Sequence, residues 1–317
     1  MKAIITKSYG SVDVLNIENI DLPSIQEDEI LVQVKAASIN PLDWRIRTGE
    51  MKIMTGKTPP RILGSDYAGI VNKVGKNIKK YKIGDEVFGL IDIVKVKEGT
   101  YAEYVKVKEN DISIKPGNSS YEESASLPLV SLTSYQALLN VAKTKKESNV
   151  LINGCAGGVG SAAVQIAKAL GHNTTGICST ANVDFAKTLG VDNVIDYKKE
   201  NVLSKKEKYD VIFDTVGNLK FSKSKNILKT GGVYVTTAVT LPAMLFTPIA
   251  NIFRAKKSKL VIVKPNSGNL SEIRKMVENK GLKGRISKVF SFNDIQKAHL
   301  MSQKGGFNGK LVLKDWK

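Results

Sequence analysis

The sequence is poor in the residues that build disulfide frameworks and metal clusters. It holds two cysteines, Cys155 and Cys178, and two histidines, His172 and His299, in 317 residues. Two distant cysteines inside apolar or glycine-rich runs exclude a disulfide scaffold and predict reduced interior thiols. The histidines lie in no constellation with other ligating residues, so we interpret both as structural or surface residues.

Long hydrophobic runs are also lacking. No apolar stretch approaches the roughly 20 residues that span a bilayer, and residues 1–15 carry no apolar signal core. Hydrophobic residues make up 42% of the chain and charged residues 25%, which is normal for a soluble globular protein. The length suits two domains, and the lack of such runs leads us to expect a cytoplasmic protein, or one whose targeting signal is absent from this sequence.

Negative charge is scarce. Lys and Arg number 48 against 30 Asp and Glu, a net charge of +18, which favours dinucleotides, nucleic acid or acidic membranes as partners. The lysines are spread evenly, and the densest stretch, residues 254–259, has no interleaved aromatic residues, so we expect no nucleic-acid groove. The charge does permit peripheral contact with an acidic membrane surface.

The pattern of hydrophobic residues along the chain changes after about residue 117. Residues 1–120 alternate with period two in short strands, which predicts a β-rich partial barrel. Over residues 121–283, helix-period segments alternate with six Val/Ile-rich runs, which predicts an α/β doubly wound parallel sheet. Residues 284–317 again show the pattern of the first 120 residues, with a helix predicted over 292–303. We therefore expect this C-terminal segment to rejoin the first domain. The six runs are residues 149–153, 174–178, 193–196, 210–214, 232–237 and 259–263.

A glycine-rich turn follows the first of these runs. The spacing is G-x-x-G-x-x-G from Gly154 and opens a helix-period segment. Glycines at such a turn let backbone amides approach a pyrophosphate, and a helix N-terminus offers free donors. We therefore expect Gly157, Gly158, Val159 and Gly160 to bind a dinucleotide.

The end of the second run carries no carboxylate. An NAD site would place Asp or Glu there to hold the ribose 2′-hydroxyl, but residues 178–182 read Cys-Ser-Thr-Ala-Asn and the next acid is Asp184. Ser179 and Asn182 leave room for a 2′-phosphate and can donate to it, which predicts NADPH as the cofactor. Lys187 is a candidate partner of that phosphate, and the choice of basic residue stays open.

Further segments carry a resemblance over nearly the whole chain. The sequence resembles the zinc-free quinone oxidoreductase branch of the medium-chain dehydrogenase/reductase superfamily, and is similar to chloroplast-envelope quinone oxidoreductases and alkenal/enone reductases. The resemblance implies a GroES-like catalytic domain over residues 1–120, a Rossmann domain for NADPH over 121–283 and a homodimer. The segments that carry it are residues 36–44, 63–69, 82–89, 99–104, 127–138, the glycine turn and 308–312.

The resemblance also bears on zinc. The zinc alcohol dehydrogenases of this superfamily carry Cys where this chain has Asn40, and His where it has Ser65. Neither side chain is a plausible zinc ligand, so we expect no metal and no Lewis acid for simple alcohol oxidation. We expect NADPH-dependent hydride transfer to acceptors that are already electrophilic, namely a quinone or the C=C bond of an α,β-unsaturated carbonyl.

By the same resemblance the nicotinamide lies in a cleft between the domains. Asn40 is the best side-chain donor for a developing oxyanion, and it is also expected to contact the cofactor. The resemblance places Asn40 and Asp43 at the cleft as catalytic residues, Val130 and Thr133 near the nicotinamide, Tyr197 near the adenosine phosphate, and Phe307, Asn308 and Lys310 over the cofactor.

Alternatives stay open at several of these positions. Asp43 also suits a cap of the helix that follows it, Thr133 the start of a helix, and Tyr67 a packed strand residue. Residues 51–60 and 240–253 are the candidate pocket loops. The rival function is an NADPH-regulated protein that binds nucleic acid or a membrane surface, and a steep salt dependence of that binding would distinguish it.

Overall fold

A computed structural model describes residues 1–59, 61–238 and 255–316 of the chain. They form two compact units, which we call unit 1 and unit 2 and describe separately. Unit 1 contains Met1–Leu129, Pro265–Asn279 and Gly284–Lys317, and unit 2 contains Val130–Lys264 and Lys280–Lys283.

These units differ from the expected domains in two respects, although residues 284–317 join unit 1 as expected. Unit 1 extends to Leu129, and it includes α9 (Ser267–Asn279), which we had expected in the cofactor domain. The helix packs on β7 (Ile112–Ile114), and the amide of Gly117 donates to Glu278 Oε1 at 3.1 Å. An amphipathic pattern shows that one face of a helix is buried, but not which sheet covers it.

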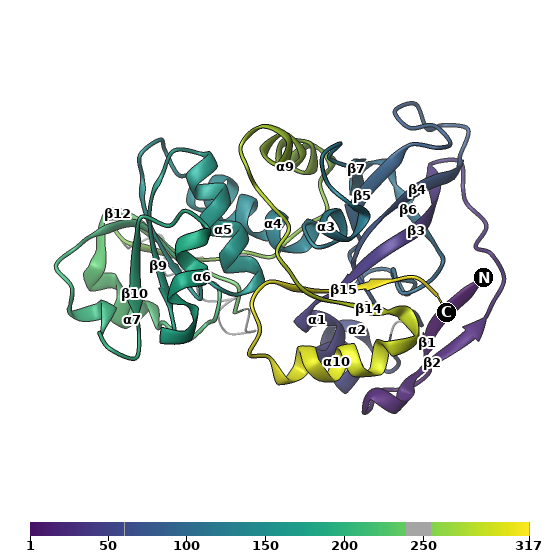
Figure 1. Cartoon of the computed structure of the whole chain (residues 1–317), viewed down its shortest axis with the longest axis horizontal. Coiled ribbons are helices and arrows are strands. Elements are labelled where there is room, and N and C mark those ends of the chain that lie inside the picture. Colours follow the sequence, from purple (N-terminus) through teal and green to yellow (C-terminus); the bar gives the residue numbers. More distant parts are fainter. Residues whose placement is uncertain (60, 239–254, 317) are drawn as a thin grey trace. The chain divides into compact units, whose positions relative to one another are not determined.

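The sheet of unit 1 is assembled from two distant parts of the chain (Figure 1). Its order is β14-β15-β3-β4-β5-β7, with β6 also paired to β3, and β1 pairs with β2 in a separate sheet. β15 is antiparallel to β3 and parallel to β14, so the C-terminal segment completes the sheet that the N-terminal segment begins. The remaining strands are β1 (Lys2–Thr6), β2 (Leu15–Asn19), β3 (Glu29–Ile39), β4 (Asp66–Val74), β5 (Glu86–Leu90), β6 (Tyr104–Lys108), β14 (Ile286–Ser291) and β15 (Lys310–Lys314).

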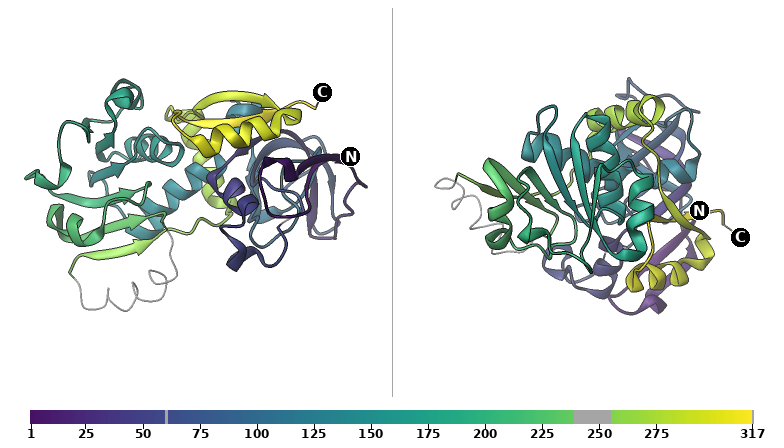
Figure 2. Two further views of the ribbon diagram at one scale, coloured as in Figure 1. Left: turned by 90° about the horizontal axis from the view of Figure 1, so that it is seen from below. Right: turned by 60° about the vertical axis from the view of Figure 1, so that its left-hand side comes forward.

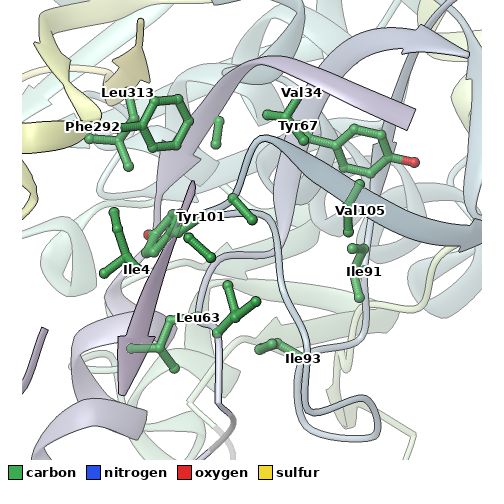
Figure 3. Close-up of a cluster of buried hydrophobic side chains, with 14 of the residues drawn as sticks. Ile4, Val34, Leu63, Tyr67, Ile91, Ile93, Tyr101, Val105, Phe292 and Leu313 are labelled. Atoms are coloured by element: carbon green, nitrogen blue, oxygen red, sulfur yellow. The ribbon is translucent and has the colours of Figure 1, made fainter. Parts of the chain in front are cut away.

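A large apolar cluster fills the interior of unit 1 (Figure 3). Ile4, Leu63 and Tyr101 from the N-terminal segment share this cluster with Phe292 and Leu313 from the C-terminal segment. Full burial of one such side chain stabilises a fold by about 1.5–3 kcal/mol. The C-terminal segment is therefore held by core packing as well as by the strand pairing of β15.

Helix α1 (Pro41–Thr48) starts where β3 ends. Asn40 has the extended backbone of an N-cap, and proline occupies the first helical position, where its missing amide costs nothing. The helix ends at Gly49, whose φ of +87° suits glycine. The other helices of unit 1 are α2 (Lys52–Thr55), α3 (Tyr121–Ala125) and α10 (Ile295–Lys304), the last preceded by the 3₁₀ turn η7 (Phe292–Asp294) where a helix over 292–303 was expected.

The sheet of unit 2 has six parallel strands in the order β10-β9-β8-β11-β12-β13. The predicted parallel sheet is therefore confirmed. The sixth strand covers Lys257–Leu260 rather than residues 259–263, although residues 260–263 are the apolar part of that run. The strands are β8 (Asn149–Asn153), β9 (Asn173–Cys178), β10 (Asn193–Asp196), β11 (Tyr209–Asp214), β12 (Leu228–Thr236) and β13.

The direction in which the chain builds this sheet reverses between β8 and β11. Because crossovers between parallel strands are right-handed, such an order puts helices on both faces. Helix α5 (Gly158–Ala169) packs on β8 and β9, and the π-helical segment η3 (Gln136–Ala142) packs on β11, β12 and β13 (Figure 2). Shorter helices are α6 (Val183–Thr188) and α7 (Phe221–Ser224), and α4 (Pro128–Tyr135) contains the border between the units.

Within the described ranges, no helix is long and apolar enough to cross a membrane.

Candidate active site

The glycine-rich turn of unit 2 joins β8 to α5. Gly154 has a φ of +80°, and a Cβ on Gly160 would lie 2.0 Å from the backbone oxygen of Gly154, so both positions require glycine. Gly157 is the N-cap of α5, and the first helical hydrogen bond runs from the amide of Ser161 to its carbonyl. The amides of residues 158–160 thus precede the helical ladder and are available to an anion.

This turn lies at the point where the strand order reverses, which is where open parallel sheets bind their ligands. Side chains tie the carboxyl ends of β8 and β11 together: Asn153 Nδ2 donates to Asp214 Oδ1 at 2.8 Å. The Asp214 carboxylate also accepts the amides of Val216, Gly217 and Leu219 at 2.8–3.1 Å. Close backbone approach, free amides and a rigid strand edge together fit a dinucleotide pyrophosphate.

Ser179, Asn182 and Tyr197 lie at the ends of β9 and β10. Ser179 precedes the short turn η4 (Thr180–Asn182), and its carbonyl accepts the Asn182 amide at 2.9 Å. The Tyr197 amide donates to the Cys178 carbonyl at 3.1 Å, and the Tyr197 side chain is 60% exposed. The structure therefore brings these three expected residues to one region of the sheet edge.

A carboxylate that we had not singled out lies in the same region. Asp196 ends β10 and accepts a hydrogen bond from Thr180 Oγ1 at 2.7 Å, which holds the pKa of this carboxyl below its usual range. The amide of Lys198 also donates to it, and Lys199 Nζ lies 3.9 Å away. Lys187, the earlier candidate for the 2′-phosphate, instead forms an exposed ion pair with Asp184 in α6.

Asn40 belongs to a buried polar cluster in unit 1. Its Nδ2 donates to Asp66 Oδ2 at 2.9 Å, and its Oδ1 accepts a hydrogen bond from Lys310 Nζ. Lys310 Nζ and Asp66 Oδ2 form an ion pair at 3.2 Å, with side chains 6% and 0% exposed. The ammonium that we expected over the cofactor is therefore committed to two partners within unit 1.

Asp43 is completely buried at the start of α1. Its Oδ2 accepts the Asn40 amide at 2.7 Å and the Tyr101 hydroxyl at 2.8 Å, so Asp43 makes the helix-capping contact weighed as an alternative to a catalytic role. Burial raises the pKa of Asp43 to about 7, and the two hydrogen bonds and the charge of Lys310 lower it by less. Its Oδ1 has no hydrogen-bond partner among the described residues.

Tyr101 links this carboxylate to a buried histidine. The rings of Tyr101 and His299 meet edge to face, with centroids 5.8 Å apart. Burial lowers the pKa of His299 to about 3, and the nearby charge of Arg47 adds to the shift, so the imidazole is neutral. This agrees with the expectation that His299 is structural.

The other expected residues lie in separate places. Val130 and Thr133 are buried in α4, and Ser134 Oγ beside them donates to the carbonyls of Val130 and Val159. Phe307 packs on the apolar cluster of unit 1, and Asn308 is half-buried in the turn before β15.

Two further sequence predictions concern Tyr67 and the pocket loops. Tyr67 is 0% exposed within β4, and burial raises the pKa of its hydroxyl, as for a packed strand residue. Of the two expected pocket loops, residues 51–59 include α2 and the 84%-exposed Ile53. Pro60 and residues 240–253 lie outside the described residues.

Comparison with known proteins identifies relatives of this chain over nearly its whole length. The family models of the alcohol dehydrogenase GroES-like domain and of a zinc-binding dehydrogenase match residues 26–117 and 189–313. The 2-methylene-furan-3-one reductase of Solanum lycopersicum and the NADPH-dependent alkenal/one oxidoreductase, chloroplastic, of Arabidopsis thaliana are each 36% identical over 99% of this chain and 79% of their own length. The quinone oxidoreductase from Coxiella burnetii is 32% identical with a TM-score of 0.89, covering 100% of this chain and 99% of its own.

The chain therefore belongs to the medium-chain dehydrogenase/reductase superfamily. Within that superfamily, its relatives are quinone and alkenal/enone oxidoreductases, as the resemblance implied. The expected combination of a Rossmann sheet and a GroES-like domain is confirmed as well.

One of the two family descriptions mentions zinc. In this chain Asn40 is bound to Lys310 and Asp66, and Ser65 is 1% exposed. In the part of the chain that the structure describes, no group of three or more His, Cys, Asp or Glu side chains could hold a metal ion.

Sequence reasoning missed Asp66, Thr180 and Tyr101. The signal for Asp66 was present, because this acid begins a strand whose next three residues, 67–69, are buried and uncharged. Such an acid needs buried donors, but only the fold shows that they come from Asn40 and Lys310.

Proposed function

We propose that this protein is an NADPH-dependent oxidoreductase that transfers a hydride, without zinc, to a quinone or to the C=C bond of an α,β-unsaturated carbonyl. The observation that carries the proposal is the Asn40 amide, whose oxygen is bound to Lys310 and one of whose hydrogens is bound to Asp66. This leaves the second Nδ2 hydrogen as a fixed donor where the zinc enzymes of the superfamily carry a metal ligand. The similarity to named enone and quinone reductases supports the same reading.

Residues of unit 2 would hold the cofactor. The first amides of α5, from Gly158 to Gly160, fit the pyrophosphate, and Gly157 leaves space for it to approach. Ser179, Asn182 and Tyr197 suit the adenosine 2′-phosphate, and the cation of Lys199, 3.9 Å from Asp196, lies in the same region. Val130 and Thr133 are assigned to the nicotinamide, and Phe307 and Asn308 to the cover over the cofactor. When bound, NADPH supplies the hydride.

The protein's part in the chemistry is to orient the acceptor and to stabilise the charge that develops on it. Hydride addition to the β-carbon of an enone leaves an enolate, and addition to a quinone leaves a hydroquinone anion. Asn40 Nδ2–H donates to that oxyanion, and preorganised donors of this kind contribute strongly because they need no reorganisation. A proton from water then completes the reduction, so no covalent protein intermediate is needed. Asp43 is assigned to orienting Asn40 through its backbone amide.

The test is NADPH oxidation at 340 nm against a panel of quinones, short enals and enones, run in parallel with NADH and repeated after treatment with EDTA. Turnover with NADPH, little turnover with NADH and no loss with EDTA are expected. An absence of turnover with every acceptor, while NADPH still binds, would refute the enzyme. That result would favour the alternative function, an NADPH-regulated protein that binds nucleic acid or a membrane surface. Salt-dependent binding to nucleic acid or anionic vesicles would then be measured.

We also propose a homodimer formed through an edge strand of the unit 2 sheet. Within the described ranges the outer strands of this sheet are β10 and β13, and the edge strand of a sheet can pair with a second copy. Light scattering at two concentrations would show a dimer mass, whereas a monomer mass at both would contradict this proposal.

We propose a cytoplasmic location, with membrane contact limited to electrostatic attraction by the net charge of +18. The name of the Arabidopsis relative places that protein in the chloroplast. Cell fractionation tests the location, and release from membranes by about 0.5 M salt, at which charge interactions are screened, tests the contact.

A further inference from the structure

Three strand ends meet at the polar cluster of unit 1. β3 ends at Ile39 just before Asn40, while the antiparallel neighbours β4 and β15 begin at Asp66 and Lys310. In the sheet β3 lies between β15 and β4, and Ser38 is the register partner of Asp66. The sheet itself therefore brings together residues 26 and 270 positions apart in the sequence.

Asp66 is the centre of this cluster. Its Oδ2 accepts hydrogen bonds from Ser38 Oγ at 2.7 Å, Asn40 Nδ2 at 2.9 Å and Lys310 Nζ at 3.2 Å. Its Oδ1 accepts the amide of Leu129, in the first turn of α4, at 2.7 Å. Four donors satisfy a carboxylate that is 0% exposed, as a buried charge requires.

These partners fix which end of the Asn40 amide points where. The ammonium of Lys310 can only donate and the carboxylate of Asp66 can only accept, so the amide oxygen must face Lys310 and the amide nitrogen must face Asp66. A flipped amide would set two donors against each other and two acceptors against each other. Since the backbone amide of Asn40 is also bound to Asp43, neither the side chain nor the backbone can turn freely.

The cation also strengthens the donor that it fixes. A hydrogen bond from an ammonium to an amide oxygen draws electron density from the amide nitrogen, and bonds in a chain polarise one another in a low-dielectric interior. The Lys310 side chain is 6% exposed, so solvent does not screen this effect. The remaining Nδ2 hydrogen is thus a stronger donor than it would be if no cation bound the amide oxygen.

We propose that Asp66 and Lys310 are positioning residues for the Asn40 amide: both orient it toward the acceptor oxygen, and Lys310 also polarises it. This inference rests on the proposed function, and it adds a preference among acceptors. An enolate is a stronger base than a hydroquinone monoanion, so it gains more from a polarised donor. Disrupting the cluster should therefore slow enone reduction more than quinone reduction.

The test is a double-mutant cycle on kcat at saturating NADPH. Lys310→Met is measured in the natural chain and again in the Asn40→Ala background, with Asp66→Asn as the second variant of the same cycle. Removing one oxyanion donor costs about 100-fold in kcat, so we expect losses approaching 100-fold in the natural chain and below about 3-fold when Asn40 is absent. The loss should be smaller with a quinone than with an enone.

A matched control exists in the same unit. Lys115 forms an ion pair with Glu86 at 3.2 Å, and its side chain is 7% exposed, close to the values for Lys310 and Asp66. Lys115→Met removes a buried ammonium of the same kind with no hydrogen bond to Asn40. We expect it to lower the Tm as Lys310→Met does, but to keep kcat within about 2-fold of the natural chain, as for a substitution without contact to the donor.

The outcomes separate the inference from the function on which it rests. If the natural chain reduces no acceptor, the proposed function fails before any variant is compared. If the natural chain reduces these acceptors, but Lys310→Met lowers kcat by the same factor with and without Asn40, the positioning role is wrong. The proposed oxidoreductase activity is then unaffected. The positioning role is also wrong if Lys310→Met lowers kcat equally for quinone and enone, or if Lys115→Met lowers kcat as much as Lys310→Met does.

Discussion

The buried carboxyl of Asp43 should make the stability of unit 1 depend on pH in an unusual direction. Its pKa is about 7 in the folded chain against an ordinary value of 3.8, because burial disfavours the ionised form. The unfolded chain therefore releases this proton at lower pH than the folded chain does. The contribution of Asp43 to stability is complete below pH 3.8 and is lost as the pH rises to about 7.

The size of the effect follows from the two pKa values. The full loss is about 4 kcal/mol, since each pKa unit corresponds to about 1.4 kcal/mol. Between pH 5 and pH 8 the loss is about 3 kcal/mol. Asp43→Asn removes the titration but keeps a side-chain oxygen that can accept from the Asn40 amide and the Tyr101 hydroxyl. The free energy of unfolding of the variant, relative to the natural chain, should therefore rise by about 3 kcal/mol from pH 5 to pH 8.

Urea unfolding followed by tryptophan fluorescence measures this difference. The chain has two tryptophans, Trp44 and Trp316, and both belong to unit 1, so the signal reports on the unit that contains Asp43. Glu278→Gln is the control in the same unit. The hydrogen bond from the Gly117 amide lowers the pKa of Glu278 below its ordinary value of 4.5. Its contribution is present above pH 4.5 and is lost only as the pH falls further, so the control difference stays flat from pH 5 to pH 8.

A difference between Asp43→Asn and the natural chain that is constant from pH 5 to pH 8 would refute the reasoning. It would mean that the folded chain ionises Asp43 near pH 4 and that burial does not control this carboxyl.

Further substitutions test the site and its supports. Asn40→Ala should lower kcat with enones by about 100-fold in the NADPH oxidation assay, and an unchanged rate would remove this residue from the mechanism. Gly157→Ala has room for its Cβ, 3.5 Å from the nearest backbone oxygen, so the protein should fold normally. It should bind NADPH about 10-fold or more weakly in a fluorescence titration, because the methyl would occupy space that we assign to the pyrophosphate. Gly160→Ala would bring its Cβ to 2.0 Å from a backbone oxygen, and thermal unfolding should show a loss of about 1–3 kcal/mol in unit 2 even without cofactor. Gly309→Ala combines a φ of +81° with a backbone oxygen 2.2 Å from the new Cβ, so we expect a similar loss in unit 1, together with a lower kcat because Lys310 is displaced.

Local patterns were sufficient to predict most of the fold. Most strands of unit 2 lie in Val/Ile-rich runs bounded by polar or glycine residues, and such a pattern depends on residues close in sequence. The exception is β13, which covers Lys257–Leu260 and so mostly precedes the apolar part of its run. The border between the units could not be predicted this way. Helix α9 has the same amphipathic pattern as a helix of a parallel sheet, but it is held in unit 1 by contacts with residues about 160 positions away.

The same distinction explains the candidate site. The glycine turn is local, so Gly154 and Gly160 were recognisable from spacing alone. The polar cluster is not local, because Asn40 meets Lys310 across 270 residues and only the pairing of β15 with β3 brings them together. Lys310 was expected through family resemblance as a residue near the cofactor, whereas the structure commits its ammonium to Asn40 and Asp66.

The pairing of β15 between β14 and β3 also has a consequence for the synthesis of the protein. A ribosome releases all of unit 2 before residues 310–314 emerge, so unit 2 can fold while the sheet of unit 1 still lacks one of its inner strands. Until then β3 has an open edge, and the Asp66 carboxylate lacks its cation. The nascent chain can therefore assemble its nucleotide-binding half first, whereas the polar cluster that we assign to the chemistry forms only after Lys310 has emerged.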